Sequence, residues 1–326
     1  MDKLRWGILG TGNIASQFAR GLEALPEHEL VGVGSRSQAS ADRFGEQFDV
    51  SHRHASYEAL AADAEVDAVY IATPHHLHRD NSILCLEAGK HVLCEKPFTI
   101  NAAQAEEVIA VARQRGLFLM EAMWTRFFPI MVRLRALLAE GVIGDLLMLQ
   151  SDFGFRIRFN PEHRLFDPAM GGGATLDVGV YPISLASMLF GAPKEIRSLA
   201  HLGQTGVDEQ AAMILGYEGG RMALMSTAVR VSTPQEAFLL GSQGQIKIHY
   251  QWWYLTHMTI SKPGQEDQEI HLPYEGNGYN YEAAEVLDCL NAGKLESDVM
   301  LLDETVSIMR TLDALREQWG LRYPME

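Results

Sequence analysis

Basic residues are scarce in this sequence relative to acidic ones. The 326 residues include 27 lysines and arginines against 42 aspartates and glutamates, which gives a formal net charge of −15. Nucleic acids and anionic membranes attract clustered lysine and arginine, so the balance argues against either as a main partner. It does not exclude a small anionic ligand, because a local pocket can be positive on an acidic protein.

Cysteine is also rare, and long hydrophobic runs are missing. Three cysteines are too few for a disulfide framework and suit a reducing compartment. No uninterrupted apolar stretch approaches the roughly 18 residues that span a bilayer. A glycine-rich motif follows the N-terminus closely and leaves no room for a signal peptide. We therefore expect a soluble, cytoplasmic protein.

Length and periodicity predict two domains of different architecture. At about 150 residues per domain the chain holds roughly two, and 47% hydrophobic residues suffice for sizeable cores. Up to residue 123, apolar runs alternate with helix-period segments, as in parallel βαβ units. The expected strands there are 4–10, 29–36, 66–73, 91–97 and 117–123, and the clearest helices are 14–25, 38–48 and 101–116. We expect an α/β Rossmann domain, with a parallel doubly wound sheet, over residues 1–123.

The pattern changes after residue 123. Many strand-like runs with hairpin-type turns follow a helical lead-in, which favours an α+β domain with a large, mostly antiparallel open sheet. The expected elements include a helix at 129–144, a strand at 151–159, a glycine-rich helical stretch at 171–191, and helices at 281–292 and 300–318. We assign residues 124–326 to this second domain.

A dinucleotide-binding motif follows the first predicted strand. Residues 10–15 read G-x-G-x-x-A, in which Gly10 permits a tight turn and Gly12 allows a pyrophosphate to approach the helix N-terminus. An ordinary strand–helix turn is the alternative interpretation. The motif lies one strand from the N-terminus and is followed by further βα units, and both facts favour dinucleotide binding. The residues expected to contact the cofactor here are Gly10, Gly12, Asn13 and Ile14.

The end of the second predicted strand discriminates between nucleotides. NAD sites place an acidic residue there to bind the ribose hydroxyls, whereas this chain has Ser35, Arg36 and Ser37. A guanidinium with hydroxyls suits a 2′-phosphate. A solvated loop arginine is the alternative. We expect Ser35 and Arg36 to bind NADP(H) in preference to NAD.

Four segments together resemble a known family. GILGTGNIA at the start, ATPHHLH at 72–78, CEKPF at 94–98 and GGGATLDVGVYPIS at 171–184 are similar to the glucose–fructose oxidoreductase/inositol dehydrogenase (Gfo/Idh/MocA) family over nearly the whole chain. EAMWTRFFP at 121–129 resembles the branches of dimeric dihydrodiol dehydrogenases and NADP-dependent D-xylose dehydrogenases. The DVG-x-YP segment also resembles the glucose–fructose oxidoreductase branch.

The resemblance implies a catalytic lysine and tyrosine. Lys96 is expected beside the nicotinamide, at the carboxyl end of a parallel strand, with Glu95 as a cofactor or orienting residue. Relatives commonly have a cis peptide before the proline of this motif. Tyr181 stands where many relatives carry histidine, and a nearby lysine ammonium would lower its phenol pKa from about 10. Lys96 and Tyr181 therefore form a candidate acid/base pair, and Asp177 is expected to position the substrate hydroxyl or Lys96.

Further roles follow from the same resemblance. It implies that Thr73, Pro74 and His78 contact the cofactor and that His76 reaches the substrate. Trp124 and Arg126 are expected at the cofactor, with interdomain packing as the alternative. No metal site is expected, because His75, His76, His78 and Cys94 match no zinc spacing.

Aromatic residues mark the predicted sheet domain. Phe153 and Phe155 are candidates for an apolar substrate pocket, although ordinary sheet core explains them too. Trp252 and Trp253 fit either sheet core or a dimer face. A homodimer through this sheet is expected.

The sequence thus predicts an NADP-dependent oxidoreductase acting on a hydroxyl or carbonyl of a sugar, polyol or trans-dihydrodiol. Two alternatives are a non-catalytic dinucleotide-binding regulator and an NAD-dependent glycosidase of the same superfamily. The regulator would be expected to lose Lys96 or Tyr181, and both are present.

Overall fold

The computed structural model describes residues 3–326, which form two compact units. Unit 1 comprises the chain up to Thr99, Ala103–Phe127 and Glu275–Thr305. Unit 2 comprises Ile100–Ala102, Phe128–Tyr274 and Val306–Glu326. The chain therefore passes between the units several times, which the single boundary expected after residue 123 does not describe.

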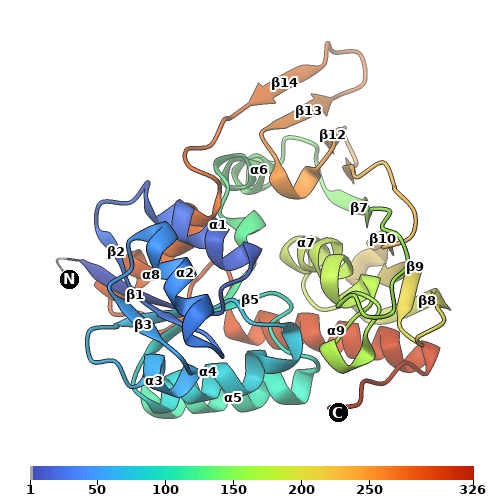
Figure 1. Ribbon diagram of the computed structural model, residues 1–326. Helices are drawn as coiled ribbons and strands as arrows, with labels where there is room; N and C mark the ends of the chain where they lie inside the picture. Colours follow the sequence, from blue (N-terminus) through green and yellow to red (C-terminus); the bar gives the residue numbers. More distant parts are fainter. Residues whose placement is uncertain (1–2) are drawn as a thin grey trace. The chain divides into compact units, whose positions relative to one another are not determined.

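Unit 1 is built on a six-stranded sheet in which every neighbouring pair is parallel (Figure 1). In spatial order its strands are β3 (His52–His54), β2 (His28–Gly34), β1 (Leu4–Leu9), β4 (Ala68–Ile71), β5 (His91–Glu95) and β6 (Leu119–Ala122). All residues of β4 and β6 are buried, as expected for parallel strands covered on both faces. This is the doubly wound Rossmann arrangement, and it confirms the predicted fold class of this part.

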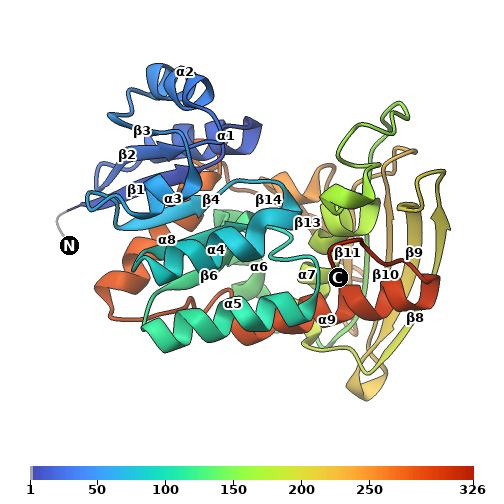
Figure 2. The same cartoon turned by 60° about the horizontal axis from the view of Figure 1, so that its bottom comes forward.

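Helices connect these strands. They are α1 (Asn13–Leu22), α2 (Gln38–Phe48), α3 (Tyr57–Ala61), α4 (His78–Glu87) and α5 (Ala102–Arg115), and α4 and α5 run side by side (Figures 1 and 2). On α1, Phe18 stacks on Tyr70 of β4 with ring centroids 3.8 Å apart and meets the edge of Trp6. The short elements β3 and α3 are missing from the sequence prediction, because three and five residues are too few to show a periodicity.

The segment 275–305 returns to unit 1 and brings helix α8 (Tyr279–Asn291) against α1. Asn277 lies just before α8, and its side-chain amide donates a hydrogen bond of 2.7 Å to the carbonyl oxygen of Gln17 in α1. Trp124 stacks on Tyr279 with ring centroids 4.6 Å apart. These contacts hold a late segment on an early helix, a pairing that no local pattern announces.

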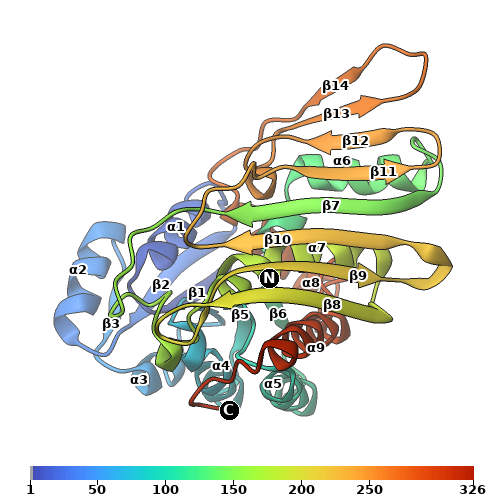
Figure 3. The same ribbon diagram turned by 90° about the vertical axis from the view of Figure 1, so that its right-hand side faces the viewer.

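Unit 2 contains an eight-stranded, mostly antiparallel sheet with one parallel pair, β7 with β10 (Figure 3). In spatial order its strands are β14 (Gln268–His271), β13 (His257–Ser261), β12 (Gln245–Ile248), β11 (Ala237–Gly241), β7 (Leu146–Gly154), β10 (Met222–Ala228), β9 (Asp208–Gly216) and β8 (Glu195–Leu202). The predicted α+β architecture is confirmed.

Helices cover one face of this second sheet. They are α6 (Pro129–Ala139), α7 (Val180–Phe190) and α9 (Leu302–Trp319); in Figure 3, α6 and α7 lie behind the strands and α9 lies beside the edge strand β8. Among residues 3–326, the stretch Pro168–Phe190 is long and apolar enough to cross a membrane, but 83% of its most apolar window is buried inside the protein. It is therefore the core helix of unit 2.

The strand predicted at 151–159 differs from the observed one. β7 begins earlier, at Leu146, and ends at Gly154. Beyond it, only Arg156 forms an isolated bridge, with Arg230. Phe155, Ile157 and Phe159 instead pack on a small separate core formed by Leu165, Phe166, Ala174 and Val229. The alternating apolar residues Phe155, Ile157 and Phe159 therefore pack on this local core beyond the end of β7 and do not belong to the strand.

Candidate functional site

The strands of unit 1 end at one level, which brings their loops to the same edge of the sheet. The register aligns Gly34 of β2, Leu9 of β1, Ile71 of β4, Cys94 of β5 and Glu121 of β6. The residues that follow four of these begin the predicted site loops, namely Ser35, Gly10, Ala72 and Glu95. Ligands of open parallel sheets bind at this carboxyl edge.

The first loop has the geometry of a dinucleotide-binding turn. Gly10 has a positive φ of +103°, and a Cβ there would lie 2.7 Å from the carbonyl oxygen of Ala72. Gly12 precedes α1, and a Cβ there would meet nothing within 4 Å. No side chain caps this helix start, so the first N–H groups, from Asn13 and Ile14 onward, are available to an anion. These residues fit a pyrophosphate.

The second loop carries the predicted nucleotide contacts Ser35 and Arg36, followed by Ser37. Ser37 is the N-cap of α2 and its hydroxyl accepts a hydrogen bond from the Ser40 N–H, so its role is structural. Ser35 is buried and Arg36 is exposed. Burial raises the pKa of Tyr57, and the positive charge of Arg36 partly opposes that rise.

The third and fourth loops are linked by a buried histidine. His78 has no exposed surface, and its ring nitrogens lie 2.9 Å from the carbonyl oxygen of Pro97 and 2.8 Å from that of Thr73. Burial lowers the pKa of His78 to about 4 despite these two carbonyls. His78 is one of the predicted cofactor residues. Its side chain is fully buried and links the loop of Thr73 to the loop of Pro97. Thr73 also accepts a hydrogen bond from Asn81, and His76 is half-buried just beyond Pro74.

The end of β5 carries Glu95 and Lys96, and the Lys96–Pro97 peptide is cis. The hydroxyl of Tyr70 donates to one oxygen of Glu95, and the main-chain N–H of Lys96 donates to the other at 3.1 Å. Glu282 of α8 is fully buried, with neither oxygen hydrogen-bonded among residues 3–326. Burial, and then the charge of Glu95, raises the pKa of Glu282 well above its usual value. Sequence reasoning missed Tyr70 and Glu282, because neither belongs to a motif.

Trp124 and Arg126 are engaged within unit 1. Trp124 is covered by Tyr279, as described above. Arg126 is 2% exposed and forms two hydrogen bonds, of 2.9 and 2.7 Å, with the carboxylate of Glu304, and one of 3.2 Å with the carbonyl oxygen of Val299. These partners, Tyr279, Val299 and Glu304, belong to the returning segment of unit 1, and a cofactor contact of Trp124 and Arg126 stays a prediction.

In unit 2, Asp208 of β9 holds the start of the helical segment that carries the predicted catalytic residues Asp177 and Tyr181. The Asp208 carboxylate accepts hydrogen bonds from the N–H of Thr175 at 2.7 Å and from its hydroxyl at 2.6 Å. Residues Thr175–Gly179 form a π-helix, and α7 continues from Val180. Pro182 thus lies just after the junction of the π-helix and α7, where the helical hydrogen-bond pattern changes and the proline supplies no N–H to it. The predicted irregularity around this proline is confirmed.

Asp177 and Tyr181 lie in this segment, and both are nearly buried. The Arg164 guanidinium donates a hydrogen bond of 2.8 Å to Asp177. Tyr181 lies against Phe153 with ring centroids 5.3 Å apart, and Phe153 stacks face to face on Trp253 at 3.4 Å. Phe153 therefore belongs to an aromatic wall beside Tyr181, whereas Phe155 touches only its edge. Sequence reasoning missed Arg164.

The tryptophan pair has two separate roles. Trp252 is 1% exposed, and its indole N–H donates a hydrogen bond of 2.8 Å to the carbonyl oxygen of Asp152. It is therefore a core residue of unit 2. Trp253, its neighbour, supplies the outer layer of the aromatic wall.

Comparison with known proteins covers both units. Residues 4–123 match the profile described as the oxidoreductase family with an NAD-binding Rossmann fold, and residues 131–247 match that of the GFO/IDH/MocA C-terminal domain. Trans-1,2-dihydrobenzene-1,2-diol dehydrogenase of Mus musculus is 38% identical over 335 residues, covering 99% of both chains. The Homo sapiens enzyme of that name is 37% identical over 332 residues, again covering 99% of both.

Solved structures show the same architecture. A 3-ketoreductase from Actinomadura kijaniata, solved with NADP and TDP-benzene, superimposes with a TM-score of 0.87 at 28% identity, covering 97% of both chains. The aldose-aldose oxidoreductase from Caulobacter crescentus, solved with glycerol, gives a TM-score of 0.89 at 25% identity, covering 98% of both.

We predict that Asp208→Ala lowers the free energy of unfolding by about 1–3 kcal/mol, because the buried N–H and hydroxyl of Thr175 lose their acceptor. Asp208→Asn keeps an acceptor oxygen and should cost less. Urea unfolding of the three proteins tests this order, and equal stabilities would show that the carboxylate does not hold the helix start.

The same residue predicts a pH effect. Burial raises the pKa of Asp208 to about 6 from its ordinary 3.8, so between these values the folded state holds a proton that the unfolded state has lost. The contribution of Asp208 to the free energy of unfolding therefore falls as the pH rises through this window. Asp208→Asn should remove that fall, and identical pH slopes in the two proteins would contradict it.

Proposed function

Because the chain belongs to the Gfo/Idh/MocA oxidoreductase family, we propose that it transfers hydride between NADP(H) and a hydroxyl-bearing carbon of a sugar, polyol or trans-dihydrodiol. The relation extends over 98–99% of the chain to dihydrodiol dehydrogenases, and this carries the proposal. The diol is favoured by those names, and the sugar by the aldose-aldose oxidoreductase.

The edge of the unit 1 sheet suits NADP(H). Gly10 and Gly12 leave room for the pyrophosphate at the start of α1, and Arg36 with Ser35 would bind the 2′-phosphate through charge-assisted hydrogen bonds. Thr73 and Pro74 would border the cofactor at the next loop. The ketoreductase neighbour was solved with NADP, in agreement with this choice. Bound there, the nicotinamide supplies a hydride acceptor or donor.

The proposed proton chemistry uses Tyr181 and Lys96. In the oxidising direction the Tyr181 phenolate accepts the hydroxyl proton while the hydrogen on the same carbon leaves with its electron pair. In the reducing direction the Tyr181 hydroxyl returns that proton to the carbonyl oxygen. The Lys96 ammonium would stabilise the phenolate and polarise the substrate oxygen. Structures of the ketoreductase neighbour include variants in which a lysine or a tyrosine was replaced.

Other residues would position the substrate. Asp177, oriented by Arg164, would accept a hydrogen bond from a second substrate hydroxyl. Phe153 and Trp253 would face the apolar side of a sugar ring or cyclic diol. His76 is a further candidate on the unit 1 side.

We predict that Tyr181→Phe lowers kcat by about 10²–10⁴-fold, the usual contribution of a positioned acid or base, while NADPH affinity is kept. Steady-state kinetics and fluorescence titration with NADPH measure the two quantities. Tyr217→Phe is a control, since Tyr217 is a buried tyrosine of unit 2 whose own hydroxyl has no hydrogen-bond partner among residues 3–326. Normal turnover in Tyr181→Phe would remove this residue from the mechanism.

Arg36→Asp should weaken NADP(H) binding selectively, because it replaces the cation proposed to face the 2′-phosphate with a repelling charge. The kcat/KM ratio for NADP⁺ over NAD⁺ is the readout. Arg115→Asp makes the same charge change at an exposed position at the end of α5 and should leave the ratio unchanged. An unchanged ratio in Arg36→Asp would contradict NADP specificity.

We propose that the open face of the unit 2 sheet forms a homodimer. Leu199, Ile214 and Met222 lie on the face opposite the helices and are 81%, 47% and 39% exposed. An exposed apolar patch on neighbouring strands is typical of a protein interface.

Replacing Leu199 and Ile214 together with aspartate should therefore yield monomers in sedimentation velocity. Leu295→Asp, at an exposed leucine of unit 1, should remain dimeric. A monomeric unmodified protein would exclude the interface.

A further inference from the structure

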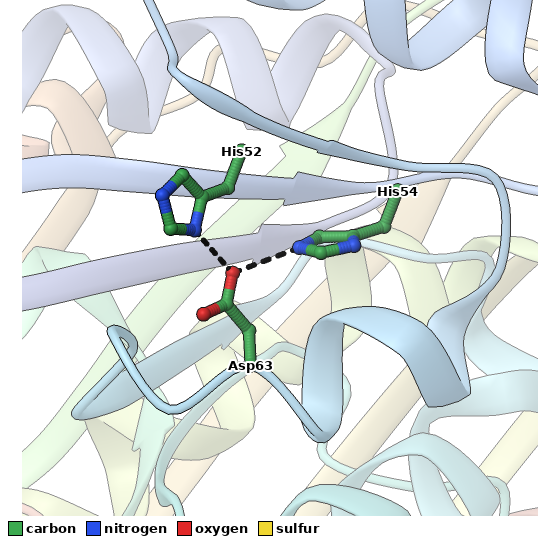
Figure 4. A group of neighbouring side chains, drawn as sticks. All are labelled: His52, His54 and Asp63. Carbon is green, nitrogen blue, oxygen red and sulfur yellow. Dashed lines mark hydrogen bonds and ion pairs between the residues drawn. The ribbon is translucent and has the colours of Figure 1, made fainter.

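Two histidines and an aspartate meet at the outer strand of the unit 1 sheet, next to the start of the loop that carries Ser35 (Figure 4). His52 and His54 are the first and last residues of β3, and alternation along a strand places both on the same side. Asp63 follows helix α3. Figure 4 shows both imidazoles turned toward the Asp63 carboxylate from the strand above it.

The three side chains converge on a single point. Nδ1 of His52 lies 2.6 Å and Nε2 of His54 lies 2.9 Å from the same oxygen of Asp63. The donor atoms all lie within 4.8 Å of one another. The two rings are not stacked, since their planes cross at 82°. Asp63 is 8% exposed, while the histidines are 38% and 23% exposed, which leaves a path from solvent.

The main chain around the cluster is held firmly. The second oxygen of Asp63 accepts a hydrogen bond from the N–H of Glu65 at 2.9 Å. The Lys90 ammonium donates to the carbonyl oxygens of Asp63 and Val66, at 2.6 and 2.8 Å. His54 is paired with β2, and its carbonyl oxygen accepts from the N–H of Ser35. The ligand atoms are thus preorganised by contacts that do not involve the ligand atoms themselves.

We propose that His52, His54 and Asp63 bind a divalent transition-metal ion of the zinc class. Two imidazoles and one carboxylate suit Zn²⁺, Co²⁺, Ni²⁺ or Cu²⁺, whereas Mg²⁺ and Ca²⁺ prefer oxygen ligands. Zinc bond lengths near 2.1 Å imply ligand separations of roughly 3.3 Å in a tetrahedron, so the nitrogen–oxygen distances need to open by less than about 1 Å. Each neutral imidazole then carries its proton on the nitrogen facing away from the ion, and solvent fills the fourth position.

A second histidine cluster provides an internal comparison. His249, His257 and Glu269 lie on the outer strands of the unit 2 sheet. The rings of His249 and His257 are stacked 4.1 Å apart at 10°, so their lone pairs run alongside one another and do not converge. Glu269 also accepts hydrogen bonds from Thr259 at 3.0 and 2.9 Å. The geometry therefore favours the β3 cluster.

The test is a titration of the untagged, chelator-treated full-length protein with Zn²⁺, followed by isothermal calorimetry, and with Co²⁺, followed by its visible absorption. We expect one site per chain, filled by Zn²⁺ and Co²⁺ and not by Mg²⁺, and a higher Tm in the presence of Zn²⁺. The double variant His52→Ala/His54→Ala removes two of the three proposed ligands. It should therefore weaken Zn²⁺ binding by at least about 100-fold, which is the largest loss of affinity that is typical when only a residue orienting a metal ligand is removed.

Controls separate this site from other histidines and from misfolding. His249→Ala/His257→Ala should bind Zn²⁺ like the unmodified protein. His54→Gln is the second variant, for use if the double variant does not fold. Its amide can still donate a hydrogen bond to Asp63, so the fold should be kept. Its affinity for Zn²⁺ should nevertheless fall. Absence of binding in the unmodified protein, or unchanged affinity in either β3 variant, would overturn the proposal. NADPH binding reports on the proposed function separately and should persist in the metal-free protein.

Discussion

The parallel register of unit 1 is the constraint on which the rest of its site depends. Leu9, Ile71 and Cys94 lie side by side in β1, β4 and β5, so the loops that follow them begin at one level. This is why a glycine turn, a threonine–proline loop and a lysine–proline loop, separated by more than twenty residues each, reach one edge. His78 links the threonine–proline loop to the lysine–proline loop, with one ring nitrogen near a carbonyl oxygen of each.

Much of unit 1 could be predicted from sequence, because its signals are local. The buried strands are short and rich in apolar residues, and Gly10 marks a turn that the structure confirms by its positive φ. The helix at Gln38–Phe48 matches its predicted bounds, since Ser37 caps it and Asp49 ends it in a left-handed conformation. What remained hidden depends on distant partners. Glu282, Tyr279 and Glu304 come from a segment far along the chain, and their positions follow from its return to α1.

Unit 2 shows the same division between local and distant information. The tyrosine, aspartate and proline of its helical segment are visible in the sequence, and Pro182 correctly indicates an irregular start. The acceptor that fixes that start is Asp208, on β9, and nothing near it in sequence identifies it. Arg164, which donates a hydrogen bond to Asp177, lies in an irregular loop, and nothing near it in sequence identifies it either. The net charge of −15 is a sum over the whole chain, against which Arg36, Lys96 and the start of α1 are local exceptions.

The central claim is that this chain moves a hydride between a hydroxyl-bearing carbon and NADP. The most direct measurement mixes the purified protein with NADP⁺ and a panel of trans-dihydrodiols, aldoses and polyols, and follows NADPH by its absorbance. The best substrate is then repeated with deuterium on the carbon that is oxidised. We expect NADPH formation with at least one of these classes, and deuterium in the reduced nicotinamide. No reduction by any class while NADPH binding is intact, or loss of the deuterium to water, would contradict it.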